Sequence, residues 1–217
     1  TQLGRGEPLE DTARVLSRFC DGLAVRTYRQ DELEKYAYWS SIPVINALTD
    51  LEHPCQALAD FFTIRESFGK LKGLTLSYVG DGNNVAHSLM ICGALLGVNV
   101  RIGCPAGFEP NPAVVSKARE LSKFGAKIHL TNDPVESVKG ADAVYTDVWA
   151  SMGQEEEQVS RVKVFQEFCL DKKLFSKASS SAIVLHCLPA HRGEEISEQL
   201  MESEASKIFD QAENRLH

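Results

Sequence analysis

The sequence predicts an α/β protein with two doubly wound parallel-sheet domains, the first of which is incomplete in this chain. Short apolar runs alternate with segments that carry helix start and stop signals, and this alternation is typical of parallel strands joined by crossover helices. Several of the runs are almost continuously apolar and β-branched, as strands buried on both faces are. With 217 residues, 43% of them hydrophobic, the chain is long enough to bury a core.

Seven runs are predicted to be strands, and in chain order they are residues 23–28, 44–47, 74–79, 98–102, 127–130, 143–146 and 182–185. Apolar and β-branched residues dominate them, and such residues favour extended structure. Residues 1–53 contain two of these strands, too few for a stable sheet with its own core. The first domain is therefore expected to be incomplete and to expose an apolar face.

The segments between the predicted strands contain residues that are typical of helix ends. Asn111-Pro112 and Asp133-Pro134 each place a capping residue before a proline that suits the first helical position. Asn84 is predicted to cap a helix over residues 85–96. A longer helix over residues 54–68 is predicted to join the two α/β units.

Charge and composition argue against several classes of protein. Lys and Arg number 23 against 30 Asp and Glu, a net charge of −7, so nucleic acid is a poor candidate partner. No apolar run approaches the ~18 residues of a membrane span. The polar start of the chain lacks the apolar core of a signal peptide. The six cysteines form no Cys-x-x-Cys motif, which argues against a zinc ribbon and favours a reducing, cytosol-like compartment.

Polar residues gather just after the predicted strands, where the ligands of open parallel sheets bind. The five places that stand out are Arg26 and residues 53–56, 80–84, 147–154 and 186–189. Each has a structural explanation by itself. Their joint placement at strand ends is the stronger indication of a site.

The glycine turn after the third predicted strand has two interpretations. Gly80-x-Gly82 follows a strand and opens a helix, as dinucleotide-binding turns do. However, Val85 occupies the third glycine position, and Arg101 lies where the acidic ligand of the ribose is expected. A tight turn with an asparagine helix cap is therefore favoured over NAD binding.

His53, Gln56 and Arg26 each have a functional and a structural interpretation. His53 precedes a proline and Gln56 lies three residues further on, so both would lie at the positive end of a helix. Such a pair can polarise a carbonyl oxygen and bind an NH₂ group, or it can be a helix cap with a surface glutamine. Arg26 lies within an apolar strand, and a buried arginine needs an anion, either a protein carboxylate or a ligand.

The ends of the last two predicted strands carry a carboxylate and a thiol. Asp147 could bind an amine, and the loop over residues 151–154 could close as a lid, or the aspartate could cap a turn. Asn83 or Asn84 could offer a side-chain amide to a substrate carboxylate. Cys187 lies beside a histidine and could be reactive, although single cysteines are more often inert.

Together these motifs resemble those of the ornithine carbamoyltransferases. In chain order the matching stretches are residues 11–16, 53–56, 80–84, 147–155, 186–189 and 212–215. The Ser-Met-Gly loop and the His-Cys-Leu-Pro stretch, at 151–153 and 186–189, point to ornithine. The His-Pro-x-Gln stretch at 53–56 is shared with aspartate carbamoyltransferases. The resemblance extends over essentially the whole chain in the order of the family.

The resemblance implies transfer of a carbamoyl group from carbamoyl phosphate to the δ-amine of L-ornithine, which gives L-citrulline and phosphate. The reaction would serve arginine biosynthesis, the urea cycle or arginine catabolism. No metal and no organic cofactor are implied, and the partners would be the two small substrates and other copies of the chain in a homotrimer. The alternatives are a carbamoyltransferase for another amine, a non-catalytic amino-acid-binding module, and an NADP-dependent dehydrogenase.

The resemblance also implies roles for individual residues. Arg26 and His53 would hold and polarise the carbamoyl oxygen. The residues implied to bind carbamoyl phosphate are Gln2, which would reach into a neighbouring subunit, and Arg26, His53, Gln56, Cys187, Leu188 and Arg215. Those implied to bind ornithine are Asn84, Asp147, Ser151 and Met152. Asp147 and Cys187 would be the catalytic pair, because a free amine is charged at neutral pH and the site has to favour its neutral form.

Two departures from the family pattern lead to expectations about the extent of the chain. The family's Ser-Thr-Arg-Thr-Arg phosphate loop is expected upstream of Thr1, and a C-terminal helix is expected after Arg215. The chain is therefore expected to be a fragment that is inactive alone. The expected location is the cytoplasm, or an organelle if a targeting peptide precedes the chain.

The expected domain organisation follows from the same resemblance. The four parts are a remnant of the carbamoyl phosphate-binding domain, a connecting helix, the ornithine-binding domain, and the start of a segment that returns to the first domain. Their bounds are residues 1–53, 54–72, 73–207 and 208–217.

Overall fold

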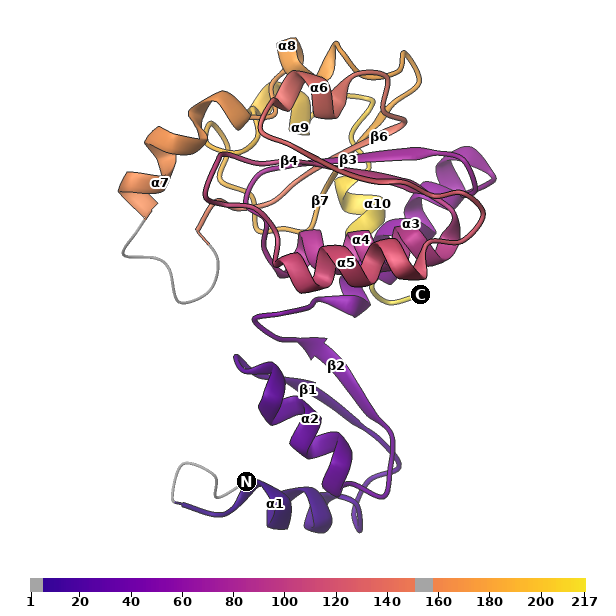
Figure 1. Ribbon diagram of the computed structural model, residues 1–217, viewed down its shortest axis with the longest axis vertical. Coiled ribbons are helices and arrows are strands. Elements are labelled where there is room, and N and C mark those ends of the chain that lie inside the picture. The colour runs from indigo at the N-terminus through magenta and orange to yellow at the C-terminus, as the bar shows by residue number, and fades with distance from the viewer. Residues whose placement is uncertain (1–5, 151–157) are drawn as a thin grey trace. The chain divides into compact units, whose positions relative to one another are not determined.

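The computed structural model describes residues 6–150 and 158–217 (Figure 1). The chain divides into two compact units, Thr1–Cys55 and Gln56–His217.

The first unit contains two helices and a two-stranded parallel sheet. Its elements are α1 (Leu9–Leu16), β1 (Leu23–Arg26), α2 (Gln30–Trp39) and β2 (Val44–Leu48). Several large apolar side chains of this unit are exposed, among them Phe19 and Tyr38, each at 78%. Tyr28 and Ile45, after β1 and within β2, are more than half exposed. The first unit therefore exposes several large apolar side chains.

The second unit is built on a five-stranded parallel sheet with the strand order β5-β4-β3-β6-β7. The strands are β3 (Thr75–Val79), β4 (Asn99–Gly103), β5 (Ile128–Thr131), β6 (Ala143–Thr146) and β7 (Ile183–His186). The chain builds outward from β3 to β5 on one side and then returns to place β6 on the other side. The topological switch point therefore lies between β3 and β6, where doubly wound sheets bind their ligands.

Helices cover both faces of this sheet, as Figure 1 shows. On one face lie α3 (Pro54–Phe68), α4 (Asn84–Leu96), α5 (Pro112–Leu121) and α10 (Ile208–Glu213). On the other face lie α6 (Pro134–Val138), α8 (Lys172–Phe175) and α9 (Glu198–Met201). The remaining elements are α7 (Gln158–Phe165) and the 3₁₀ helix η3 (Gln166–Phe168). Coverage on both faces explains why every residue of β6 and β7, and every residue of β3 after Thr75, is buried.

The core of the second unit lies against the central strands. Every residue of β6 and β7 is buried. One buried cluster includes Val79, Val144, Val184 and Ile196. All seven predicted strands are confirmed, with ends that differ by no more than two residues. Burial on both faces made β6 and β7 recognisable in the sequence, whereas β1, whose residues alternate between half-buried and exposed, was recognisable from its apolar residues.

The helix caps follow the sequence with one correction. Asn111 and Asp133 cap α5 and α6 through their side chains, as predicted. The cap of α4, however, is Asn83, whose side-chain oxygen accepts hydrogen bonds from two backbone N–H groups. Asn84 is already the first helical residue. The prediction that Asn84 is the cap is wrong because the helix begins one residue earlier than its apolar pattern.

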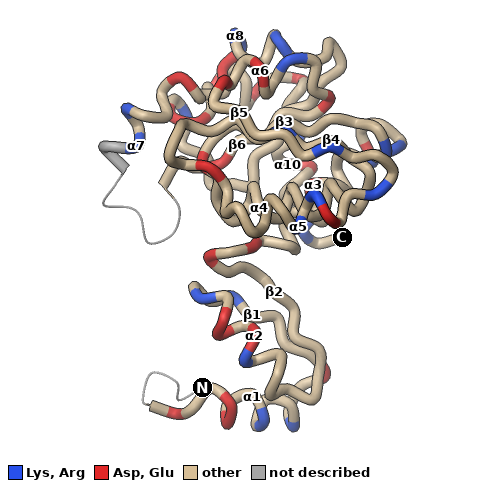
Figure 2. Tube along the Cα trace, in the orientation of Figure 1, with Lys and Arg blue, Asp and Glu red and all other residues tan. Residues whose placement is uncertain are grey.

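Charged residues of both signs are interspersed along the described elements (Figure 2). Neither sign forms one continuous stripe along the described tube in this view. Within the described part of the chain, no helix combines the length and the apolar character that a membrane span requires.

Candidate active site

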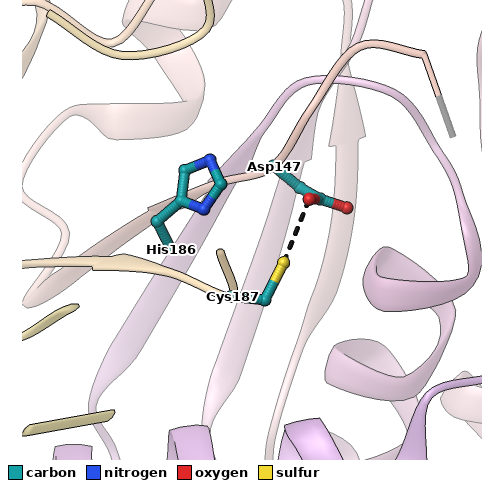
Figure 3. Close-up of side chains that lie close together, drawn as sticks. All are labelled: Asp147, His186 and Cys187. Atoms are coloured by element: carbon teal, nitrogen blue, oxygen red, sulfur yellow. Dashed lines mark hydrogen bonds between the residues drawn. The ribbon is translucent and has the colours of Figure 1, made fainter. Parts of the chain in front are cut away.

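The hub of the site is the carboxylate of Asp147, the residue that follows β6. Its Oδ1 accepts hydrogen bonds from the backbone N–H of Val148, at 2.8 Å, and from the thiol of Cys187, at 3.0 Å. Its Oδ2 accepts a hydrogen bond from Nδ2 of Asn83, at 2.8 Å. Thr146 and His186 are paired in the parallel register, so the residues after them emerge at the same edge of the sheet. The ends of β6 and β7 therefore bring a carboxylate and a thiol together (Figure 3), and Asn83, which precedes α4, adds an amide.

Cys187 takes part in this site as a hydrogen-bond donor. Burial raises the pKa of its thiol well above the ordinary value, and the negative charge of Asp147 raises it further. The thiol therefore stays protonated near neutral pH and donates a hydrogen bond to Asp147. Of the two alternatives for Cys187, a reactive or an inert thiol, the raised pKa favours the inert one, because a low thiol pKa requires neighbouring positive charge and this thiol faces a carboxylate.

We expect Cys187 to resist alkylation at pH 7.5. Iodoacetamide attacks thiolates, and each unit by which the pKa rises lowers the thiolate fraction about tenfold. Cys20 is exposed, so it is the internal reference. In the folded chain Cys187 should be modified at least about tenfold more slowly than Cys20, measured by peptide mass spectrometry. In 6 M urea the two rates should converge. Equal rates in the folded chain would contradict the hydrogen-bonded, protonated thiol.

His186 is directed to a different partner from Cys187. Its Nδ1 accepts a hydrogen bond from the backbone N–H of Leu188, at 2.9 Å, so the neutral ring carries its proton on Nε2. Nε2 lies 3.1 Å from Oε1 of Glu195, and both side chains are buried. This pair ties the end of β7 to the segment that precedes α9.

The side chains of Asp147, His186 and Cys187 place possible ligand atoms within 4.8 Å of one another, close enough to suggest a metal. Both ring nitrogens of His186 already have hydrogen-bond partners, and the thiol of Cys187 is protonated. In Figure 3 the dashed line joins Cys187 to Asp147, and the imidazole lies beside them. The donor set therefore fits a hydrogen-bonded network, and we assign no metal to it.

Gln56 and Arg215 are brought together although they are 159 positions apart in the chain. Nη1 of Arg215 donates to Oε1 of Gln56, at 2.7 Å. Nε2 of Gln56 donates to Oδ1 of Asp60, at 2.8 Å. Gln56 is 2% exposed, so the alternative of a surface glutamine is excluded.

The predicted residues of the first unit have a mixed outcome. His53 is buried and directly precedes Pro54, the first residue of α3, as the spacing predicted. Arg26 is exposed, and the prediction of a buried arginine is wrong. The reason is that β1 belongs to a two-stranded sheet, so its alternate residues face solvent. Gln2, Ser151 and Met152 lie outside the described residues.

The glycine turn has a structural explanation. The backbone N–H of Gly82 donates to the carbonyl oxygen of Phe108, at 2.9 Å. A Cβ atom on Gly82 would lie 2.3 Å from the backbone nitrogen of Pro110. The close approach that a dinucleotide phosphate would need is therefore taken by the chain's own backbone. This favours the tight turn over NAD binding.

Two buried carboxylates of the second unit were missed from the sequence, Asp60 in α3 and Glu195 before α9. Each is 0% exposed. Neither residue follows a strand, so neither lies where the sequence places the ligand-binding residues of a parallel sheet. Asp60 would be found by noting a carboxylate at position i+4 from Gln56 on the buried face of a predicted helix.

The fold is a doubly wound parallel α/β sheet, and the site lies at its carboxyl edge, where proteins of this architecture bind small ligands. The family model for the Asp/Orn binding domain of aspartate/ornithine carbamoyltransferases matches residues 72–217. The model for the carbamoyl-P binding domain of the same family matches residues 1–66. The chain belongs to the aspartate/ornithine carbamoyltransferase family.

Individual relatives agree with the family. The chain is 70% identical to an ornithine carbamoyltransferase of Prochlorococcus marinus (strain MIT 9313), over 100% of this chain and 68% of the relative. It is 71% identical to one of Parasynechococcus marenigrum (strain WH8102), with the same coverage. The crystallographic structure of ornithine carbamoyltransferase from Gloeobacter violaceus is 53% identical, with a TM-score of 0.91 over 97% of this chain and 71% of that one. The Pyrococcus furiosus enzyme is 50% identical, with a TM-score of 0.96 over 100% and 70%.

These likenesses confirm the predicted parallel α/β fold, the predicted family and the assignment of the chain to a family of carbamoyl-transferring enzymes. The chain spans about 70% of the length of each of these relatives.

Proposed function

We propose that the protein transfers the carbamoyl group of carbamoyl phosphate to the δ-amine of L-ornithine, giving L-citrulline and phosphate. The observation that carries this proposal is the Asp147 carboxylate, which accepts hydrogen bonds from Cys187 and Asn83 at the switch point of the sheet. A carboxylate in this place suits an amine-bearing substrate. The relatives named ornithine carbamoyltransferases, at 70% and 71% identity, support ornithine as that substrate.

The chemistry asks the site to hold an amine near a carbamoyl carbon. The amine nitrogen forms a bond to that carbon, the bond from carbon to the bridging phosphate oxygen breaks, and phosphate leaves with the electron pair. A free alkyl amine has a pKa near 10 and is an ammonium at neutral pH, so its nitrogen loses two protons in all. The first goes to solvent before the attack, and the second leaves as the new bond forms and would be accepted by the leaving phosphate. An oriented carboxylate beside a protonated thiol serves to bind and direct the amine.

The remaining roles are proposals that rest on the resemblance. Arg26 and His53 would stabilise the oxyanion that develops on the carbamoyl oxygen. The residues proposed to bind carbamoyl phosphate are Gln2, Arg26, His53, Gln56, Cys187, Leu188 and Arg215. The residues proposed to bind ornithine are Asn84, Asp147, Ser151 and Met152. The hydrogen bond between Arg215 and Gln56 supports placing these two at one end of one substrate.

The proposed organisation assigns one substrate to each domain. Residues 1–53 would be the remnant of the carbamoyl phosphate-binding domain and residues 73–207 the ornithine-binding domain, with residues 54–72 as connection and 208–217 as a returning segment. Gln56, Cys187, Leu188 and Arg215 would add contacts to carbamoyl phosphate from outside the first domain. The matches of the carbamoyl-P model to residues 1–66 and of the Asp/Orn model to 72–217 support this assignment. We further propose a cytoplasmic homotrimer that works in arginine metabolism, and the exposed apolar side chains of the first unit suit a further protein surface.

The proposal is tested by citrulline formation. Two polypeptides are compared, the 217-residue chain and the same chain extended at both ends with the flanking segments of the 70%-identical Prochlorococcus relative. We expect the extended protein to form citrulline only when both substrates are present. We expect the unextended chain to be at least about a hundredfold slower, because correct placement of both reactants supplies much of the acceleration.

The contrary outcome is equally specific. An extended protein that folds and binds ornithine by calorimetry, yet neither binds carbamoyl phosphate nor forms citrulline, would show an amino-acid-binding module and overturn the proposed reaction.

A further inference from the structure

Asp60 is a buried carboxylate to which neither the sequence motifs nor the proposed reaction assigns a role. It lies in α3 and is 0% exposed. Its Oδ1 accepts a hydrogen bond from Nε2 of Gln56, at 2.8 Å, and another from Nε2 of Gln211, at 2.6 Å. Burying a carboxylate is costly, and neutral amides offset that cost less completely than a cation does. The burial of the Asp60 carboxylate at such a cost calls for an explanation.

The two glutamines lead from Asp60 to two different parts of the site. Oε1 of Gln56 accepts a hydrogen bond from Nη1 of Arg215, at 2.7 Å. Oε1 of Gln211 accepts a hydrogen bond from the backbone N–H of His186, at 2.9 Å. His186 is the last residue of β7 and directly precedes Cys187. One carboxylate oxygen thus connects the Gln56–Arg215 pair to the strand end that carries the thiol.

Asp60 also fixes which way each carboxamide points. A carboxamide has a donating NH₂ group and an accepting oxygen, and exchanging the two reverses its hydrogen bonds. An ionised carboxylate is an acceptor only, so it holds the NH₂ groups of Gln56 and Gln211 toward itself. Their oxygens then face Arg215 and the N–H of His186, both of which are donors. In this orientation each of the four hydrogen bonds that link Asp60, the two glutamines, Arg215 and His186 joins a donor to an acceptor.

We propose that Asp60 is a positioning residue that sets the carboxamides of Gln56 and Gln211, and through them the spacing between the Gln56–Arg215 pair and the end of β7 that carries Cys187. This proposal deepens the proposed function and rests on it for the roles of Gln56, Arg215 and Cys187. Asp60 itself need not touch either substrate.

Titration of Asp60 offers a way to observe this role. Burial raises the pKa of its carboxyl to about 7, and the two glutamines, Tyr145 and the charge of Arg215 lower it only in part. The described groups that act on it electrostatically are Cys92 of α4, Tyr145 of β6, Cys187 after β7 and Arg215 after α10. Burial raises the pKa values of the two thiols and the phenol, so these three stay neutral around pH 7.

The direction of the pH effect follows from these charges. Above pH 7 Asp60 is ionised and makes charge-assisted hydrogen bonds to both amides. Below pH 7 it is protonated and becomes a weaker acceptor. The carboxamides are therefore held most firmly on the alkaline side of the midpoint.

The first test uses NMR of the side-chain amides and needs no turnover. In ¹H–¹⁵N spectra of the 217-residue chain, the NH₂ signals of Gln56 and Gln211 should shift together with a midpoint near the pKa of about 7 that burial gives Asp60. In Asp60→Asn this common titration should vanish, because asparagine keeps an accepting oxygen and does not ionise. Amide signals that do not titrate, or that titrate unchanged in Asp60→Asn, would overturn the proposal.

The second test uses kinetics of the extended protein. Asp60→Asn should keep the turnover at pH 8 within about fivefold, because both glutamines donate to the same carboxylate oxygen, so the amide oxygen can still accept both while the NH₂ group replaces the other oxygen. Its acid limb in kcat near pH 7 should disappear. Asp60→Leu removes the acceptor and should lower kcat about a hundredfold, with a smaller change in KM for ornithine, because misplacement of the reacting groups acts mainly on the chemical step.

The outcomes separate a positioning role from a structural one. Equal losses in the two variants, or an unaltered acid limb in Asp60→Asn, would mean that Asp60 matters for packing alone. If Asp60→Leu does not fold, the NMR titration and Asp60→Asn still decide. If the unaltered extended protein forms no citrulline, the proposed reaction fails, while the amide titration independently decides whether Asp60 orients the glutamines.

Discussion

Replacement of Asp147 by asparagine should lower citrulline formation by the extended protein by at least about 10³-fold, since oriented acid–base groups contribute 10²–10⁴. Asparagine has the same size, so the loss would come from hydrogen-bond chemistry. The two oxygens of Asp147 accept from three donors, on Val148, Cys187 and Asn83. Whichever oxygen becomes NH₂ opposes at least one of those donors. The variant also loses the negative charge that would attract the substrate amine.

The measurement is kcat and KM for ornithine at fixed carbamoyl phosphate. Both should change, because the carboxylate would act on the bound amine as well as on the reacting one. Asp142→Asn is the matched control, since Asp142 also accepts a backbone N–H, that of Thr75 at 2.8 Å, but precedes β6 and lies at the other end of the strand. Retention of more than about a tenth of kcat by Asp147→Asn would remove this carboxylate from the chemistry.

A second large effect is expected on stability, from Gly82→Ala. The added Cβ would lie 2.3 Å from Pro110 N, 2.5 Å from Glu109 C and 2.6 Å from Phe108 O. All three are backbone atoms, so a side-chain rotation cannot relieve the clash. The segment that faces Gly82 would have to shift, and with it the hydrogen bond from Gly82 to Phe108. We expect the free energy of unfolding to fall by about 3 kcal/mol, the upper part of the range for overpacking.

Urea unfolding followed by circular dichroism measures this loss. Gly107→Ala is the control, because Gly107 has a φ of +87° but no heavy atom within 4 Å of the added Cβ. It should lose only about 1 kcal/mol, the cost of placing alanine in the left-handed region. Equal unfolding midpoints for the two variants would mean that the close approach at Gly82 relaxes without cost.

The elements that were predicted correctly from the sequence are those whose residues lie close together along the chain. Strands β6 and β7 are buried along their whole length, and β3 along all but its first residue, because helices cover both faces of the sheet, and the mostly apolar runs that result are local. The caps Asn111 and Asp133 are equally local, since each bonds to backbone two or three residues away. Such features are predictable because the residues that form them are neighbours in the sequence.

The parts that escaped prediction depend on distant partners. Arg26 looked buried because its own strand is apolar, but exposure depends on how many strands lie beside it. Asp60 bonds to Gln211, 151 positions later, and no spacing rule connects the two. Asp147 and Cys187 were placed at one edge because parallel strands end together. The hydrogen bond that keeps the thiol protonated required the structure.

One side chain, that of Asn83, meets two requirements at once. Its oxygen accepts the N–H groups of Val85 and Ala86 at the start of α4, while its nitrogen donates to Asp147. Serine could cap the helix but offers no NH₂ group, and aspartate could cap it but would set a second carboxylate against the first. A substitution of Asn83 that is meant to change the environment of Asp147 therefore also changes the N-terminal cap of α4. Changes of substrate preference should be sought at positions that do not carry this double duty.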